Sequence, residues 1–139
     1  MTEPTINDIK ELVRKELVKT KDEINRGVLD SIQLLKTFIS IEEGTGRIVI
    51  LNNETLTNTE KVKLLMVGKH IAALAEIIDS PEADIQIISD ETGVLKTTLS
   101  APLGDLVKKN VLLKDGAKYK FNDALIKKEV QALVEKMKK

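Results

Sequence analysis

Cysteine is absent from the 139 residues, which excludes disulfide bonds, a thiol nucleophile, thiolate zinc sites and iron–sulfur clusters. Histidine occurs only at position 70, where no second histidine can join it on a metal ion, so we interpret it as a packed or surface side chain. Ser100 lacks a plausible base partner for nucleophilic catalysis. The sequence therefore predicts a protein that is not an enzyme and that holds no metal or cofactor.

Long apolar runs are also absent, since none approaches the roughly 20 residues needed to span a bilayer. Residues 1–4 do not show the basic and then apolar layout of a secretory signal, so we expect a cytoplasmic protein without membrane contact. Hydrophobic residues make up 42% of the chain and charged residues 32%, a balance typical of a globular protein that buries a core. This length predicts one compact domain, or a small domain with a helical arm.

An overall charge of one sign is missing too, because 22 basic residues balance 22 acidic ones. The distribution is uneven: residues 1–39 carry seven of each sign, residues 40–93 carry four basic and ten acidic, and residues 94–139 carry eleven basic and five acidic. A cationic last third on a neutral protein favours one face that meets phosphate. The alternative is that these lysines only keep the end of the chain solvated.

The first 56 residues show helical and then strand-like patterns. Apolar side chains recur at steps of three and four between residues 6 and 39, which predicts amphipathic helix. Thr20 with Glu23 resembles a capping box, so either a second helix begins there or one bent helix passes through Gly27. Two β-prone stretches joined by a glycine-containing turn then predict a β-hairpin over residues 38–51. We assign residues 1–56 to an N-terminal helical arm and β-hairpin.

Residues 57–139 form the second predicted unit. A capping box at Thr57 and Glu60 begins a long apolar-periodic helix, which we expect to extend to Ile78. A short helix from Asp84, a turn at Gly93 and a second helix follow. Two β-prone stretches are then joined by Asp115-Gly116, a sequence that favours a type I′ hairpin turn with positive φ at both central residues. Asn122 is expected to cap a final helix.

The stretch from Gly93 to Ser100, followed by Leu103, Leu106 and residues 108–112, resembles recognition helices of winged helix-turn-helix DNA-binding proteins. The resemblance covers residues 83–121. It implies a helix-rich α+β fold, namely a winged helix-turn-helix preceded by N-terminal helices and a β-hairpin. It also implies that the glycine makes the inter-helix turn, that small polar residues face the major groove and that the hairpin lies along the DNA backbone. Asn110 stands where the pattern usually has glycine, and asparagine also suits a left-handed C-terminal cap.

We predict that nine residues contact DNA. Some are predicted from this resemblance, and the others from their positive charge close to the residues that carry it. They are Lys96, Thr97, Thr98, Ser100, Lys108, Lys109, Lys114, Lys118 and Lys120. The alternatives are a solvated helix start for the first four and edge-strand protection for the last three. Ala101 and Pro102 depart from the pattern, since related sequences often carry long polar side chains there. Pro102 also predicts a late helix start, with Thr98 or Ser100 as the cap.

The function that these patterns predict is that of a small dimeric transcriptional regulator that binds double-stranded DNA. Its sequence specificity is expected to be modest, because the recognition helix contains no arginine or glutamine for bidentate base contacts. The homodimer follows from full apolar stripes on the flanking helices, which alternatively pack within one monomer. The alternative function is a protein–protein interaction module without DNA binding, which the neutral charge and the Ala101-Pro102 face favour.

Overall fold

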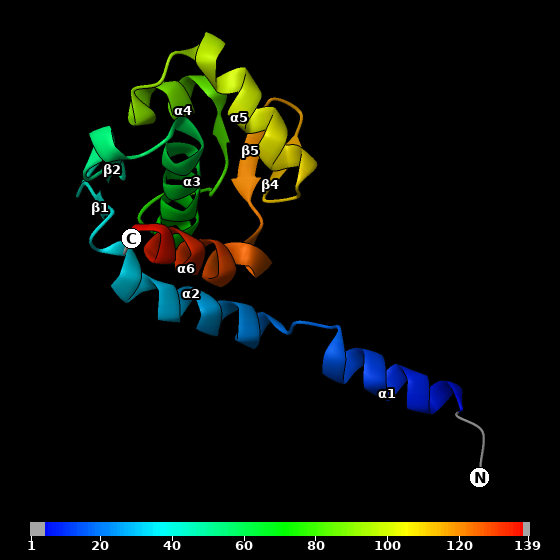
Figure 1. Ribbon diagram of the computed structural model, residues 1–139. Coiled ribbons are helices and arrows are strands. Elements are labelled where there is room, and N and C mark those ends of the chain that lie inside the picture. Colours follow the sequence, from blue (N-terminus) through cyan, green and yellow to red (C-terminus); the bar gives the residue numbers. More distant parts are fainter. Residues whose placement is uncertain (1–4, 138–139) are drawn as a thin grey trace.

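The computed structural model describes residues 5–137 and combines helices with two small antiparallel sheets (Figure 1). The first half contains α1 (Ile6–Glu16), α2 (Lys21–Leu35), β1 (Ile39–Ile41), β2 (Ile48–Ile50), the 3-10 turn η1 (Asn53–Thr55) and α3 (Asn58–Leu74). The second half contains β3 (Ala83–Asp84), α4 (Ile85–Thr92), α5 (Lys96–Lys108), β4 (Leu112–Asp115), β5 (Lys118–Phe121), the 3-10 turn η2 (Asp123–Leu125) and α6 (Ile126–Met137). The predicted mixture of helix and sheet, with helix in excess, is confirmed.

Helix α3 lies at the centre of the core because its side chains are buried on several sides. Val62, Leu64, Leu65 and Met66 are completely buried, and the hairpin β1–β2, α4, α5 and β5 all pack around this helix (Figure 1). A Cβ atom on Gly68 would lie 2.9 Å from Ile48 Cγ2, so glycine is what lets the hairpin approach the helix closely. The helix ends four residues before the predicted Ile78, and Glu76 just beyond it adopts a positive φ of 60°.

Both predicted hairpins are present. In the first, β1 pairs antiparallel with β2, and Ile39 lies opposite Ile50. In the second, β4 pairs with β5, which also pairs with β3, giving the strand order β3-β5-β4. The pairing of Asp115 with Lys118 makes Gly116 and Ala117 the central turn residues. Only Gly116 has positive φ, which is the pattern of a type II′ turn, so the expected type I′ turn is wrong.

Helix α5 begins at Lys96, so the expected late start with a cap at Thr98 or Ser100 is wrong. Pro102 therefore lies inside the helix, where its missing N–H and ring cost about 3 kcal/mol. The same helix buries Leu99, Leu103 and Leu106, shown by exposures of at most 2%, and each buried leucine contributes about 1.5–3 kcal/mol. Burial of the three leucines outweighs the cost of the proline, so the helix continues through it.

Asparagines hold the junctions on either side of the β4–β5 hairpin. Asn110 has φ 62°, its N–H donates to the Val107 carbonyl at 3.0 Å, and the Val111 N–H donates to the Leu106 carbonyl at 2.9 Å, which confirms the left-handed cap of α5. Asn122 makes no side-chain cap. Its Nδ2 instead donates to the Asn110 carbonyl at 2.9 Å, and η2 intervenes before α6. The prediction that Asn122 caps the final helix is therefore wrong.

Helices α2 and α6 lie side by side below the core (Figure 1). Val28 and Leu35 of α2 and Val130 and Leu133 of α6 are buried, so the apolar stripe of the last helix finds its partner within the chain. Thr20 accepts a hydrogen bond from the Glu23 N–H at 3.2 Å, and α1 and α2 are separate helices. Helix α1 buries none of its residues and projects away from the rest of the chain (Figure 1).

Candidate functional site

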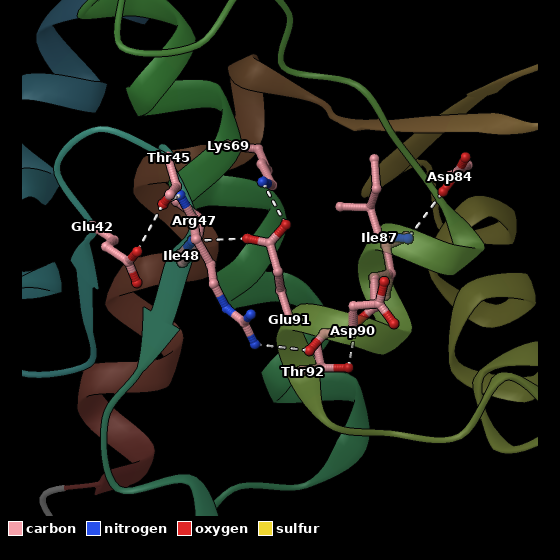
Figure 2. Close-up of polar contacts among 11 residues, drawn as sticks. Glu42, Thr45, Arg47, Ile48, Lys69, Asp84, Ile87, Asp90, Glu91 and Thr92 are labelled. Atoms are coloured by element: carbon pink, nitrogen blue, oxygen red, sulfur yellow. Dashed lines mark hydrogen bonds and ion pairs between the residues drawn. The ribbon is translucent and has the colours of Figure 1, made fainter.

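A buried ion pair fixes α4, and with it the start of α5, against the core (Figure 2). One carboxylate oxygen of Glu91 accepts from Lys69 Nζ at 2.7 Å, and the other accepts from the Ile48 backbone N–H at 2.8 Å. The Lys69 and Glu91 side chains are only 10% and 11% exposed. Arg47 Nη2 also donates to the Asp90 carbonyl at 3.1 Å. Because protein donors occupy both oxygens of Glu91, this carboxylate joins three segments, namely α3, β2 and α4.

A second polar cluster joins α3 to α6. Glu60 accepts from the Thr57 N–H at 2.8 Å within the capping box and from Lys136 Nζ at 2.6 Å. Burial alone would raise the pKa of Glu60, but the hydrogen bonds from Lys136 and Thr57 outweigh it and hold the pKa below its ordinary value of 4.5. The carboxylate is therefore charged at neutral pH and holds the last turn of α6 against the start of α3.

His70 lies half-buried on α3, on the side near β5 and η2. Burial lowers its pKa, and the charge of Lys120 lowers it further, while Asp123 opposes the shift. The net effect is a pKa below 6.5, so the imidazole is neutral at pH 7. Within residues 5–137, no three histidine, aspartate or glutamate side chains form a group that could hold a metal ion.

All nine predicted DNA-contacting residues are exposed. On α5, side chains three or four residues apart share a face, and the face turned away from the buried leucines carries Thr97, Ala101, Gly104 and Lys108. Ser100 lies four residues after Lys96, so these two share a neighbouring face. The 12 steps from Lys96 to Lys108 span about 18 Å along the helix axis. The outward surface of α5 is therefore formed by small side chains and Lys108, while Lys96 lies at the start of the helix on the neighbouring face.

The lysines of the β4–β5 hairpin do not all lie on one side. Lys114 lies opposite Tyr119, and its Nζ is 5.5 Å from the centre of that ring. Lys118 and Lys120 are two residues apart on β5. Since successive side chains in a strand point to opposite faces, Lys118 and Lys120 share one face and Lys114 lies on the other. The structure therefore brings two of the three predicted hairpin lysines together and separates the third.

The predicted lysines differ in whether an acidic side chain compensates their charge. Lys109 pairs with Asp105 at 3.1 Å, and both side chains are well exposed. The remaining five, at positions 96, 108, 114, 118 and 120, make no ion pair with any residue that the structure describes. Positive charge is thus in excess along α5 and the hairpin β4–β5, where Asp105 and Asp115 are the acidic residues and Asp115 lies opposite Lys118. These two elements lie next to one another (Figure 1).

Sequence reasoning missed the residues that hold this surface in place. Glu91 and Lys69 are 22 residues apart, and Glu91 and Ile48 are 43 apart, so no periodic pattern connects them. The available signal was a lysine inside the apolar α3 segment, because a buried lysine requires an acidic partner. That signal indicates a partner without identifying it.

Comparison with known proteins does not assign this surface. No protein-family model, curated protein or solved structure matches the chain. None of the helices in the described part of the chain is long and apolar enough to cross a membrane. The candidate functional surface is therefore defined by the arrangement of α4, α5 and the β4–β5 hairpin and by the charges that they carry.

Proposed function

We propose that this chain is a winged-helix protein that binds double-stranded DNA and acts in the cytoplasm as a small, dimeric transcriptional regulator. The observation that carries the proposal is the set of five exposed, unpaired lysines on α5 and the β4–β5 hairpin. The order α3-β3-α4-α5-β4-β5, with strand order β3-β5-β4, supports it, because the second helix of a helix-turn-helix enters the major groove. In this proposal α5 is the recognition helix and the hairpin β4–β5 is the wing.

The start of α5 supplies a further feature that suits a phosphate. Leu95 at its N-cap makes no side-chain hydrogen bond, so no side chain caps the free N–H groups of the first turn. Backbone N–H groups at a helix start, together with the helix dipole, favour a phosphate oxygen. Lys96 adds a positive charge at the same place, and the hydroxyls of Thr97 and Thr98 are exposed beside it.

The specificity of the proposed complex is modest. The outward face of α5 offers Thr97, Ala101 and Gly104, which make at most weak contacts with base edges. Phosphate contacts from the lysines fix the position of a protein on the duplex but carry no sequence information by themselves. We therefore expect most of the affinity to come from phosphates and any sequence preference to come from DNA shape.

An electrophoretic shift with mixed-sequence duplex DNA at low ionic strength tests the proposal directly. We expect binding at micromolar protein, and we expect the double variant Lys118→Glu with Lys120→Glu to weaken it strongly. Lys128→Glu is the matched control, because Lys128 is an exposed lysine on α6, outside the proposed surface. No shift at micromolar protein, or an equal loss in the control, would contradict DNA binding by this surface.

A protein–protein interaction module is the second candidate. The observation that favours it is the sparse outward face of α5, where Ala101 and Gly104 offer no polar side-chain group. Small side chains of this kind let the surface of another protein approach α5 closely. Failure of DNA binding, with the fold intact by circular dichroism, would support this candidate over the first.

A further inference from the structure

Helix α1 presents an apolar stripe that its own chain leaves uncovered. Four large apolar side chains on the helix and one at its C-cap are between 39% and 78% exposed: Ile6, Ile9, Leu12 and Val13, and then Leu17. The helix has 11 residues, and isolated helices shorter than about 12–15 residues are only marginally stable in water. An exposed apolar face on so short a helix is the kind of surface through which helices pack against a partner.

The same chain carries an open apolar groove. Its volume is about 240 Å³, and it lies between the end of α2, β1 and α3. Its apolar lining comes from Ile32, Leu35, Ile39, Ile41 and Ile71. Ile32 is 41% exposed, and Leu29, which lies three residues earlier on α2, is 67% exposed. The groove and this part of α2 therefore form one continuous apolar surface of the kind that receives an amphipathic helix.

Helix α1 does not cover the groove of its own chain. It leaves α2 at the N-terminal end of that helix, whereas the groove is at the C-terminal end, and it points away from the core (Figure 1). The 11 steps from Lys21 to Ile32 place these ends about 16 Å apart. A second copy of the chain can supply the missing helix without any refolding of α1.

The charge of α1 distinguishes between a membrane, DNA and a second copy of the chain as its partner. Residues 1–39 carry seven basic and seven acidic side chains, and α1 itself carries three of each sign. A helix that lies on an anionic membrane or on DNA is expected to be enriched in lysine and arginine, and α1 is not. The groove lining contains one charged residue, Lys36, so a helix with three charges of each sign can enter the groove of a second copy without net like-charge repulsion. The neutral composition therefore favours self-association.

We propose that α1 of one copy docks with Ile6, Ile9 and Val13 in the Ile32–Ile71 groove of a second copy, and that the second copy returns the same contact. The result is an arm-exchanged homodimer with two identical helix-in-groove interfaces. This inference rests on the dimer part of the proposed function and is independent of DNA contact. The exchange also places two copies of α5 in one assembly, as a two-fold symmetric DNA site requires.

Light scattering at tens of micromolar protein tests the exchange. We expect twice the chain mass of 15.4 kDa for the unaltered protein and a single chain mass for Ile9→Glu. Circular dichroism should show that this variant keeps its folded core, because α1 buries nothing in its own chain, while its unfolding temperature falls because the groove loses its partner. Val18→Glu is the matched control, since Val18 is 47% exposed but lies beyond the helix, and it should remain dimeric. Ile32→Asp, which alters the groove instead of the arm, should also give single chains.

The absence of cysteine allows the contact to be mapped by cross-linking. A mixture of the Ile9→Cys chain with the Ser40→Cys chain should give a cross-linked product of two chains, because Ser40 also lines the groove. A single-chain mass for the unaltered protein, a dimer that survives Ile9→Glu, or the absence of the cross-linked product from this mixture would overturn the exchange. A DNA shift separates the two proposals. Ile9→Glu single chains that still bind DNA support the exchange and DNA binding alike, whereas an unaltered protein that is dimeric but binds no DNA contradicts only DNA binding.

Discussion

At the scale of single residues, Glu91 is the side chain on which the orientation of α4 depends most directly. Its two oxygens accept from Lys69 and from the Ile48 backbone in a site that is nearly closed to water. Removing one member of a buried pair leaves the other member charged and without a partner, which costs far more than breaking an exposed pair. The position of the proposed recognition helix therefore depends on a residue that has no contact with DNA.

Glu91→Ala is expected to lower the free energy of unfolding by about 3–5 kcal/mol, because it leaves the Lys69 ammonium and the Ile48 N–H buried without an acceptor. Urea titration followed by circular dichroism measures the change. Asp105→Ala is the control, since it breaks the exposed Lys109 pair and should cost at most about 1 kcal/mol. Equal effects of the two substitutions would show that the buried pair does not stabilise the fold in this way.

Glu60 is expected to make stability depend on acid pH. Its pKa is lowered in the folded chain, so its contribution is complete above the unfolded value of 4.5 and is lost as the pH falls below 4.5 through the folded pKa. Glu60→Gln should therefore be less stable than the unaltered chain at pH 7, and the difference should shrink in urea titrations repeated at pH 3. A difference that stays constant between these pH values would contradict the assigned pairing with Lys136.

At the scale of elements, two glycines inside helices should respond in opposite directions to the same substitution. Gly68→Ala would place a Cβ atom 2.9 Å from Ile48 Cγ2 and push the hairpin β1–β2 off α3, so we expect a loss of about 1–3 kcal/mol. Gly104→Ala meets nothing within 4 Å and should stabilise α5 by roughly 0.4–1 kcal/mol. Thermal unfolding of both variants tests the expectation, and a destabilised Gly104→Ala would contradict the open face described for α5.

The elements themselves could largely be predicted from local patterns. Capping residues at Thr20 and Thr57 marked helix starts, and glycines marked both hairpins. The failures have a common physical cause, which is competition between a local preference and a contact made elsewhere in the chain. Pro102 opposed the early part of α5, but burial of three leucines decided the outcome. Asn122 suited a cap, but the Asn110 carbonyl takes its amide hydrogen bond.

For the candidate site, too, the local features could be predicted from the sequence, whereas the contacts between distant residues could not. Exposure of the nine predicted residues followed from their polarity and their place in the helical and strand patterns. Separation of Lys114 from Lys118 and Lys120 depended on the hairpin register, which a shift of one residue in the turn would have reversed. The contact between Lys69 and Glu91 could not be found from sequence, because neither residue type nor spacing specifies which acid meets which base.

At the scale of the whole molecule, charge and apolar surface are separated along the chain. The neutral first 39 residues include α1 and α2, while the cationic last third contains α5 and the β4–β5 hairpin. This separation allows the proposed dimer contact and the proposed DNA contact to use different surfaces. Substitutions can then disrupt the dimer contact without disrupting the DNA contact, and the reverse.

The most direct test of DNA binding is the salt dependence of affinity for a labelled mixed-sequence duplex, measured by fluorescence anisotropy. Each lysine that neutralises a phosphate contributes about 0.9 to the slope of log affinity against log salt. We predict a steep fall of affinity with salt, and a slope that is shallower by about 1.8 per chain for Lys118→Ala with Lys120→Ala but unchanged for Lys128→Ala. Affinity that does not respond to salt, or a slope that the two hairpin substitutions leave unchanged, would contradict the account.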